Sequence, residues 1–331
     1  MPSLQPGSAL QESDSQSAIE AMACLHLKPQ NALGFLYVSL ALGLTAFAIF
    51  LSLSPHVAFW LVGQVLLALA LLQWFCILHE AGHKTLFRSA WLNKCAGYVA
   101  GFYALIPFDC WKLIHARHHR WTGWQDLDAT TATLVTRKLH WFERIIVNTC
   151  WRFSLPLFST IYRLNNYWLL PRLFRYFPHA GQRRRLVLNI AGSLAAYGLL
   201  IGFVGPQTFV RLTGLALFLT LVMQDPLILS QHTHIPMQLS GGNPVVPFPA
   251  QEQAVFTRSL LFPLWFSRWI LINLDAHELH HVHTSIPGYY LHVLGRDTQN
   301  GVPWWKWVWA AKQLRGDVLL FLNRNQTGFD L

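Results

Sequence analysis

Two long apolar blocks dominate the pattern of hydrophobic and polar positions along the chain. The first runs from about residue 33 to 78, breaks near Ser54-Pro55, and contains no Asp, Glu, Lys or Arg. The second runs from about residue 186 to 229, breaks at Gly205-Pro206, and has Arg211 and Asp225 as its only charged residues. At about 1.5 Å per residue, each half of a block is long enough to cross the roughly 30 Å hydrocarbon layer of a bilayer. The pattern predicts four membrane-spanning helices in two hairpins, over about residues 33–53, 57–78, 186–204 and 207–229.

The segments outside these blocks have other patterns. Residues 91–108 are apolar but short for a span, which favours a re-entrant or interfacial segment. Residues 109–185 mix aromatic and basic side chains, as amphipathic helices at the level of the lipid headgroups do. Residues 240–250 predict a loop, and residues 252–281 predict a helix. We therefore expect an all-α membrane protein with a flexible tail over residues 1–30 and a single domain over 31–331, whose helical cap comprises residues 79–185 and 230–331.

Composition and charge support a membrane protein and indicate its orientation. Only 12% of the residues are charged and 53% are hydrophobic, whereas an average soluble domain has about a quarter charged residues. Sixteen of the 25 Lys and Arg residues lie between Lys84 and Arg185, and the two turns between paired spans have none. By the positive-inside rule, both termini and the cap are expected on the cytoplasmic side of the inner membrane. The net charge of +10 then reflects topology and lipid or protein contacts rather than nucleic-acid binding.

Histidines are the candidate chemistry, because ten of the sixteen fall in four short groups. Three of these groups have the i, i+3 or i+4 spacing that places side chains on one face of a helix, and all four fall on the same predicted side of the membrane. Neutral imidazole binds iron, copper, zinc and nickel. Since one zinc ion takes three or four protein ligands, so many converging imidazoles indicate two metal ions. The groups are His79 and His83 in HEAGH, His115, His118 and His119 in HARHH, His232 and His234 in QHTH, and His277, His280 and His281 in HELHH.

Three of these motifs resemble the histidine boxes of the integral-membrane fatty acid desaturase and hydroxylase superfamily. The surroundings of the second and third boxes, HARHHRWTGWQDLD and HELHHVHTSIPGYYL, are similar to that family as well, and LSQHTHIP resembles the segment that supplies an additional ligand. The resemblance covers roughly residues 33–295. It implies a cytosol-facing pair of iron ions that activates O2, held beneath a helical cap on four spans.

The resemblance also implies roles for individual residues. The implied ligands are His79, His83, His115, His118, His119, His277, His280 and His281, joined by His232 or His234, of which we favour His232. Glu80 stands where many members of the family have Asp, and we expect this carboxylate to orient a ligand by accepting an imidazole N–H. The same role is open to Asp126, Asp128, Asp275 and Glu278.

The resemblance implies desaturation of a fatty acyl chain as the expected reaction. This reaction needs abstraction of hydrogen from an unactivated C–H bond, which requires a metal–oxygen oxidant. The substrate is an acyl lipid, an acyl-CoA or an acyl carrier protein, placed in an apolar tunnel. The five cysteines form no CxxC pair, and no Gly-rich dinucleotide fingerprint is present. Electrons are therefore expected from a separate ferredoxin, rubredoxin or cytochrome with its reductase.

Other functions use some of the same features. A hydroxylase, ketolase or acetylenase would need the same ligands, and the sequence does not separate these outcomes from desaturation. A metal transporter would need polar or ionisable groups along its spans, but the histidines gather at one end of them. A haem electron carrier needs one or two axial ligands, which leaves most of the histidines without a role.

Overall fold

The computed structural model describes residues 27–295 and 298–331, and this part of the chain is mostly helical. The tail expected over residues 1–30 lies outside the described residues except for its last four positions. Within the described part, four helices are long and apolar enough to cross a membrane, which confirms the prediction of four such helices. They are α2 (Asn31–Ser52), α3 (Val57–His83), α9 (Ala180–Val204) and α10 (Pro206–His232).

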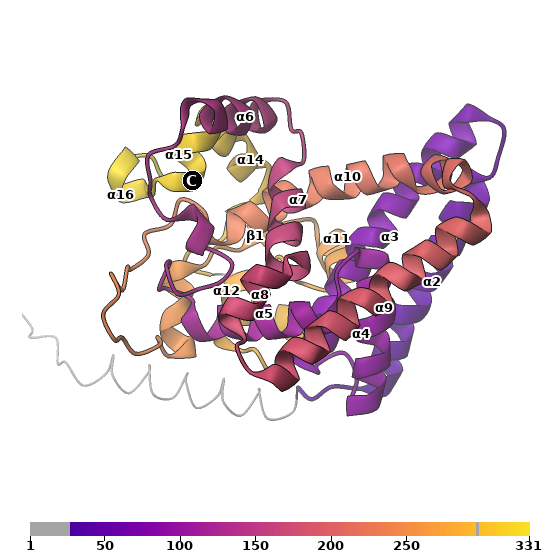
Figure 1. Ribbon diagram of the computed structural model, residues 1–331, viewed down its shortest axis with the longest axis horizontal. Helices are drawn as coiled ribbons and strands as arrows, with labels where there is room; N and C mark the ends of the chain where they lie inside the picture. The colour runs from indigo at the N-terminus through magenta and orange to yellow at the C-terminus, as the bar shows by residue number, and fades with distance from the viewer. Residues whose placement is uncertain (1–26, 296–297) are drawn as a thin grey trace, which may run out of the picture.

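The remaining elements are shorter, and most of them gather at one end of the four long helices, while α4 lies alongside α3 (Figure 1). A parallel pair of two-residue strands is the only sheet in the described segments. The helices are α4 (Ala90–Ala104), α5 (Phe108–Trp121), α6 (Trp141–Arg152), α7 (Leu157–Arg163), α8 (Leu170–Tyr176), α11 (Leu264–Phe266), α12 (His277–Val282), α13 (Gly288–Leu291), α14 (Trp304–Gln313), α15 (Gly316–Phe321) and α16 (Arg324–Thr327), and the strands are β1 (Leu260–Leu261) and β2 (Val302–Pro303).

Helix α3 is the centre of the packing. It contacts α2, α4 and α10. In its most apolar stretch of 18 residues, 72% is buried, whereas in the corresponding stretch of α9 only 6% is buried. It also runs five residues past the predicted end of the second span, so that the HEAGH motif forms its last turns. The helix ends at Lys84, whose backbone is left-handed. This extension carries His79 and His83 out of the apolar block and towards the shorter elements.

Two glutamines inside α3 connect the long helices through hydrogen bonds. The Gln64 Nε2 donates to the Ser52 hydroxyl at 2.9 Å and to the Leu212 carbonyl at 2.8 Å, and its Oε1 accepts the Ala216 N–H at 3.0 Å. The Gln73 Nε2 donates to the Trp269 carbonyl at 2.8 Å. In an apolar environment each unsatisfied polar group is costly, so these bonds fix how α2, α10 and the later loop sit on α3. The hydropathy pattern does not reveal this role.

The segment over residues 252–281 is not the helix that its composition predicts. It contains a 3-10 helix (Ala250–Phe256), strand β1, the three-residue helix α11, a π-helical turn (Ser267–Leu271) and only then α12. Pro263 has no backbone N–H to continue a helix, and Ile272 and Asn273 have positive φ angles. The chain therefore reverses before α12 begins. In contrast, most of the segment over residues 91–108 belongs to helix α4, which ends at Ala104 and packs on α3. Its position relative to a bilayer stays a prediction.

Close contact between α2 and α3 can be tested at Gly63. A Cβ atom there would lie 2.7 Å from the Ala48 carbonyl oxygen and 2.7 Å from the Ser52 nitrogen, which are backbone atoms that cannot move aside. We expect Gly63→Ala to lower the free energy of unfolding by roughly 1–3 kcal/mol, as overpacking does, measured by thermal unfolding of the purified protein. Gly43→Ala is the control, because its Cβ would meet nothing within 4 Å. Equal melting temperatures for the two variants would contradict the close packing.

Candidate metal centre

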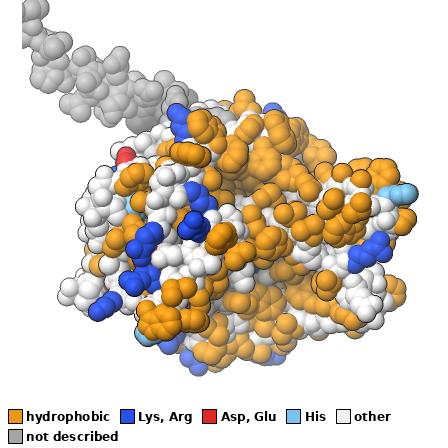
Figure 2. All heavy atoms as spheres, turned by 90° about the horizontal axis from the view of Figure 1, so that it is seen from above, with side chains coloured by type: hydrophobic (Ala, Val, Ile, Leu, Met, Phe, Trp, Pro, Cys, Tyr) orange, Lys and Arg blue, Asp and Glu red, His pale blue; other side chains and the backbone are white. Residues whose placement is uncertain are grey.

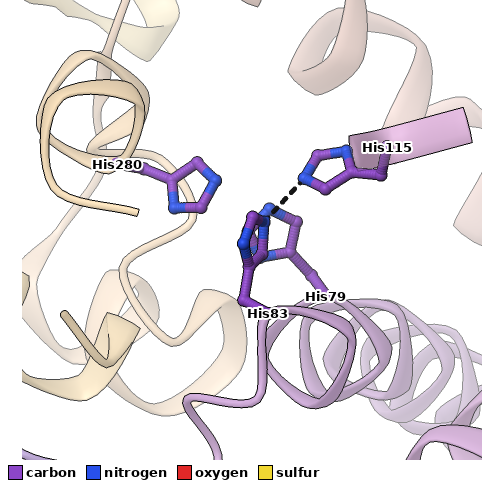
Figure 3. A group of neighbouring side chains, drawn as sticks. All are labelled: His79, His83, His115 and His280. Carbon is purple, nitrogen blue, oxygen red and sulfur yellow. Dashed lines mark hydrogen bonds between the residues drawn. The ribbon is translucent and has the colours of Figure 1, made fainter. Parts of the chain in front are cut away.

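Eight of the ten histidines form two compact groups where α3, α5, α10 and α12 meet. In each group the ligand nitrogens all lie within 4.8 Å of one another, so each group could hold a metal ion. Figure 3 shows the first group, with rings from α3, α5 and α12 turned towards one another. The first group is His79, His83, His115 and His280, and the second is His118, His232, His277 and His281.

The helical spacing of the motifs explains how both groups form. His79 and His83 are one turn apart on α3 and point into the same group. The motifs on α5 and α12 instead divide between the groups. Side chains three residues apart share a face but lie about 60° apart around the helix axis, so each can meet a different neighbouring helix. His115 faces the first group and His118 the second, while His280 faces the first and its neighbour His281 the second. Each of these two short helices therefore bridges the two groups.

His119 lies at the boundary of the groups. Its Nε2 is 3.0 Å from the His115 Nε2 and 3.1 Å from the His280 Nε2, and its ring centroid is 4.4 Å from that of His281. Its Nδ1 is buried without a hydrogen-bond partner. The ring is thus placed to contact a metal ion in the first group even though it belongs to neither set of four.

The two histidines of the QHTH motif have different surroundings. His232 ends α10 in the second group, and its Nε2 lies 3.0 Å from the His277 Nε2. His234 lies outside both groups, where its Nε2 is 2.8 Å from the Thr327 hydroxyl and 3.1 Å from the Phe329 carbonyl. The structure therefore brings His232 to the centre and uses His234 to hold the C-terminal segment.

The protonation state of the rings suits metal binding. Burial lowers the pKa of His277, His280 and His281 well below its ordinary value, and the positive charge that neighbouring rings would carry lowers it further. The same causes act on His115 and His119. These imidazoles are therefore neutral at pH 7, which is the form that coordinates transition metals.

For four of the rings, oxygen atoms around the cluster fix which nitrogen faces inwards. The Asp128 Oδ2 is 2.7 Å from the His118 Nδ1, and the Glu80 Oε1 is 3.2 Å from the His79 Nδ1. The Phe256 carbonyl lies 3.1 Å from the His232 Nδ1, and the Gln253 Oε1 lies 2.9 Å from the His281 Nδ1. With the proton on Nδ1 donated outwards, each Nε2 keeps its lone pair for a metal ion.

The carboxylates themselves are held in place by further contacts. Glu80 accepts hydrogen bonds from the Thr85 hydroxyl and the Gly288 N–H, both at 2.7 Å, and Asp128 accepts the Thr130 N–H at 2.8 Å. Of the other acidic candidates, Asp126 accepts from the Ser240 N–H, Asp275 from the Ser267 hydroxyl, and Glu278 from the Ser259 and Asn300 N–H groups.

The donor set fits two transition-metal ions. Several Nε2 atoms face one another rather than a protein oxygen, as in the 2.8 Å approach of His83 to His115 and the 3.1 Å approach of His277 to His281. The His79 Nε2 is buried and has no hydrogen-bond partner. A cation bound by these nitrogens would satisfy them together, since nitrogen-rich imidazole sites suit iron, copper or zinc.

A small cavity of about 70 Å³ reaches both groups. It is lined by His79 and His115 of the first group and by His118, His232 and His277 of the second, together with Phe75, Trp111, Tyr162 and Leu274. A small molecule or the end of a substrate in this cavity would contact metal ions held in either group.

Comparison with known proteins identifies what the chain is similar to. Residues 54–307 match the fatty acid desaturase family. The sn-1 oleoyl-lipid 12-desaturase of Picosynechococcus sp. is 24% identical over 233 residues, which are 66% of this chain and 62% of that protein. The endoplasmic reticulum omega-6 fatty acid desaturase of Brassica juncea is 25% identical over 264 residues, 70% of this chain and 66% of the relative. A Synechocystis sn-1 acyl-lipid omega-3 desaturase (ferredoxin) is 31% identical over 130 residues, 38% of this chain and 33% of that protein. The chain thus spans less than two thirds of the length of the first two relatives.

The orienting role of Asp128 leads to a prediction about metal affinity. Asp128→Asn keeps the shape but removes the negative charge beside His118, and loss of such a partner typically weakens metal binding about 10–100-fold. The measurement is competition of the metal-loaded protein with a chelator of known affinity. Asp126→Asn serves as the matched control, because Asp126 bonds Ser240 rather than a histidine. Equal metal affinity in the two variants would contradict the role assigned to Asp128.

Proposed function

Because the chain belongs to the fatty acid desaturase family, we propose that it desaturates a fatty acyl chain at two iron ions held by the two histidine groups. The observation that supports this most directly is the meeting of the two groups around one cavity. The proposed ligands of the first ion are His79, His83, His115, His119 and His280, and those of the second are His118, His232, His277 and His281.

The chemistry consumes one O2, two electrons and two protons for each double bond and releases two waters. Bound iron would supply the O2 activation and the hydrogen abstraction that no side chain can perform. The chain's own residues hold the ligands and orient them through Glu80, Asp128, Gln253 and the Phe256 carbonyl. Burial of the cluster excludes bulk water from the reacting centre. The small cavity places one part of the acyl chain beside the ions.

The proposed setting is a membrane. Residues 31–331 act as one unit whose four long helices span the bilayer, with the histidine centre and both termini on the cytoplasmic side. The clustering of Lys and Arg between Lys84 and Arg185 supports this orientation. Only 6% of the most apolar 18-residue stretch of α9 is buried. This exposed apolar surface supports contact between α9 and lipid tails.

The proposed partners follow from the chemistry. The substrate is an acyl lipid, as the names of the Picosynechococcus and Synechocystis relatives support. Electrons come from a separate ferredoxin, rubredoxin or cytochrome and its reductase; one relative is named for ferredoxin, and this chain has no CxxC pair to ligate an iron–sulfur centre of its own.

The reaction can be identified in a host of known lipid composition. Expression of the chain should produce fatty acids that have lost two hydrogens, detected by mass spectrometry of extracted lipids. Fatty acids that gain an oxygen instead would show a hydroxylase, and those results would contradict desaturation. Host cells that carry the empty vector give the background.

The ligand assignment predicts loss of both iron and turnover in single variants. His118→Ala and His280→Ala each remove a ligand from a different group, so each should lower the iron content from two ions per chain and abolish product formation. The measurements are elemental analysis of the purified protein and the lipid assay. His179→Ala is the control, because His179 is exposed at the start of α9. Full iron content and activity in either ligand variant would refute that assignment.

A further inference from the structure

A groove on the surface leads towards the histidine centre. It is a cavity of about 720 Å³ between α6, α7, α10 and the segment over residues 130–139. Most of its lining is apolar, with Leu139, Phe142, Ile146, Val147, Leu157, Phe158, Ile161 and Ile228 among the side chains. Its volume is within the roughly 300–1,000 Å³ typical of ligand sites.

The groove adjoins the small cavity between the histidine groups. Five residues line both spaces, so the two share a wall at the point where they meet. The lining of the small cavity includes members of both groups, and neither of two further apolar cavities is lined by any of the ten clustered histidines. The shared residues are Thr130, Leu134, Tyr162, Ile228 and Leu229.

The outer end of the groove opens beside an apolar surface. On α6, Phe142 and Ile146 line the groove and are 54% and 36% exposed, and the neighbouring Trp141 and Ile145 are 60% and 54% exposed. Figure 1 places α7 beside α10 and α6 next to α15, and Figure 2 shows hydrophobic side chains over much of the face seen from above, with Lys and Arg to one side of them. A short helix with exposed aromatic and aliphatic side chains and a few cations is typical of the membrane interface.

Charged groups stand at the same opening. Arg137 and Glu143 line the groove and form two hydrogen bonds of 2.9 Å to each other. Lys138 and Arg144, their neighbours in the sequence, are exposed. The opening therefore combines an apolar entrance with a surplus of positive charge, which matches an acyl tail joined to a lipid phosphate.

We propose that the acyl chain enters sideways from the bilayer through this groove, while its phospholipid headgroup stays at the interface near Arg137, Lys138 and Arg144. This inference rests on the proposed desaturase function and assigns its substrate route. Phe142 and Ile146 form the entrance, and Tyr162 and Ile228 form the neck through which the chain passes to the histidine centre. These four side chains determine which part of an acyl chain reaches the ions.

A second apolar cavity is the rival route. It has a volume of about 490 Å³ and lies on another side of α10, lined by Met223, Leu227, Phe262, Trp304 and Val308 among others. It has Asp225 in common with the groove but contains none of the clustered histidines. It therefore offers space for a lipid tail without access to the centre.

The route can be mapped by photocrosslinking that requires no turnover. The full-length protein in nanodiscs would be irradiated with a phosphatidylcholine that carries a diazirine on one acyl chain, and labelled peptides would be identified by mass spectrometry. Label is expected on the segment over residues 130–134, on α7 and on α10. Ile146→Trp should reduce this labelling about tenfold, as an obstruction of ~1.4 kcal/mol would. Ile145→Trp is the matched control, because Ile145 is exposed on the same helix but does not line the groove.

Three results would overturn the route. In the first, the label is concentrated around Phe262 and Val308, and its amount decreases in the Val308→Trp protein. In the second, the Ile146→Trp and Ile145→Trp proteins are labelled equally. The third is equally strong labelling of the groove by a diazirine acyl-CoA supplied from the aqueous phase, which would contradict entry with a phospholipid. The lipid assay on the same proteins separates the two proposals. Groove labelling without product would refute the desaturase function alone, and product formed equally by both Trp variants would refute the route alone.

Discussion

The structure depends on burying a cluster of neutral imidazoles whose Nε2 atoms face one another. Polar atoms without a partner are unfavourable in a protein interior. The rings therefore keep this arrangement only where other groups hold them from outside the cluster. Here the outer nitrogens of His79, His118, His281 and His232 are held by Glu80, Asp128, Gln253 and the Phe256 carbonyl, respectively. The same bonds that stabilise the rings in place also leave the inner nitrogens free for metal ions. Stability and chemistry thus share one set of contacts.

The long helices give this cluster a rigid base. α3 is the most buried of the four and carries two of the rings on its last turns. Gln64 and Gln73 connect it to its neighbours by hydrogen bonds inside a mostly apolar layer. Because α10 packs on α3 and ends at His232, the second group is tied to the same base as the first. An acyl chain in the groove beside α10 would therefore meet a centre whose position relative to the membrane is set by the spans.

Much of this organisation follows from local sequence, and some of it does not. Hydropathy locates the four long helices, because the length and apolar composition of a helix are properties of its own residues. The i, i+3 and i+4 spacing predicts that histidines share helix faces. The spacing does not show that the motifs on α5 and α12 divide between two groups, since that depends on where a third helix meets them. Gln253 lies in no motif, and its contact with His281 arises only from the reversal of the chain before α12. The same reversal breaks the helix that composition predicts over residues 252–281.

Whether histidines from helices far apart in the sequence hold two metal ions is tested most directly by the iron content per chain, combined with X-ray absorption of the purified wild-type protein in a membrane mimetic. We expect about two iron ions per chain with nitrogen-dominated coordination, in keeping with a set of imidazoles too large for one ion. A single ion per chain, or a haem spectrum, would contradict it.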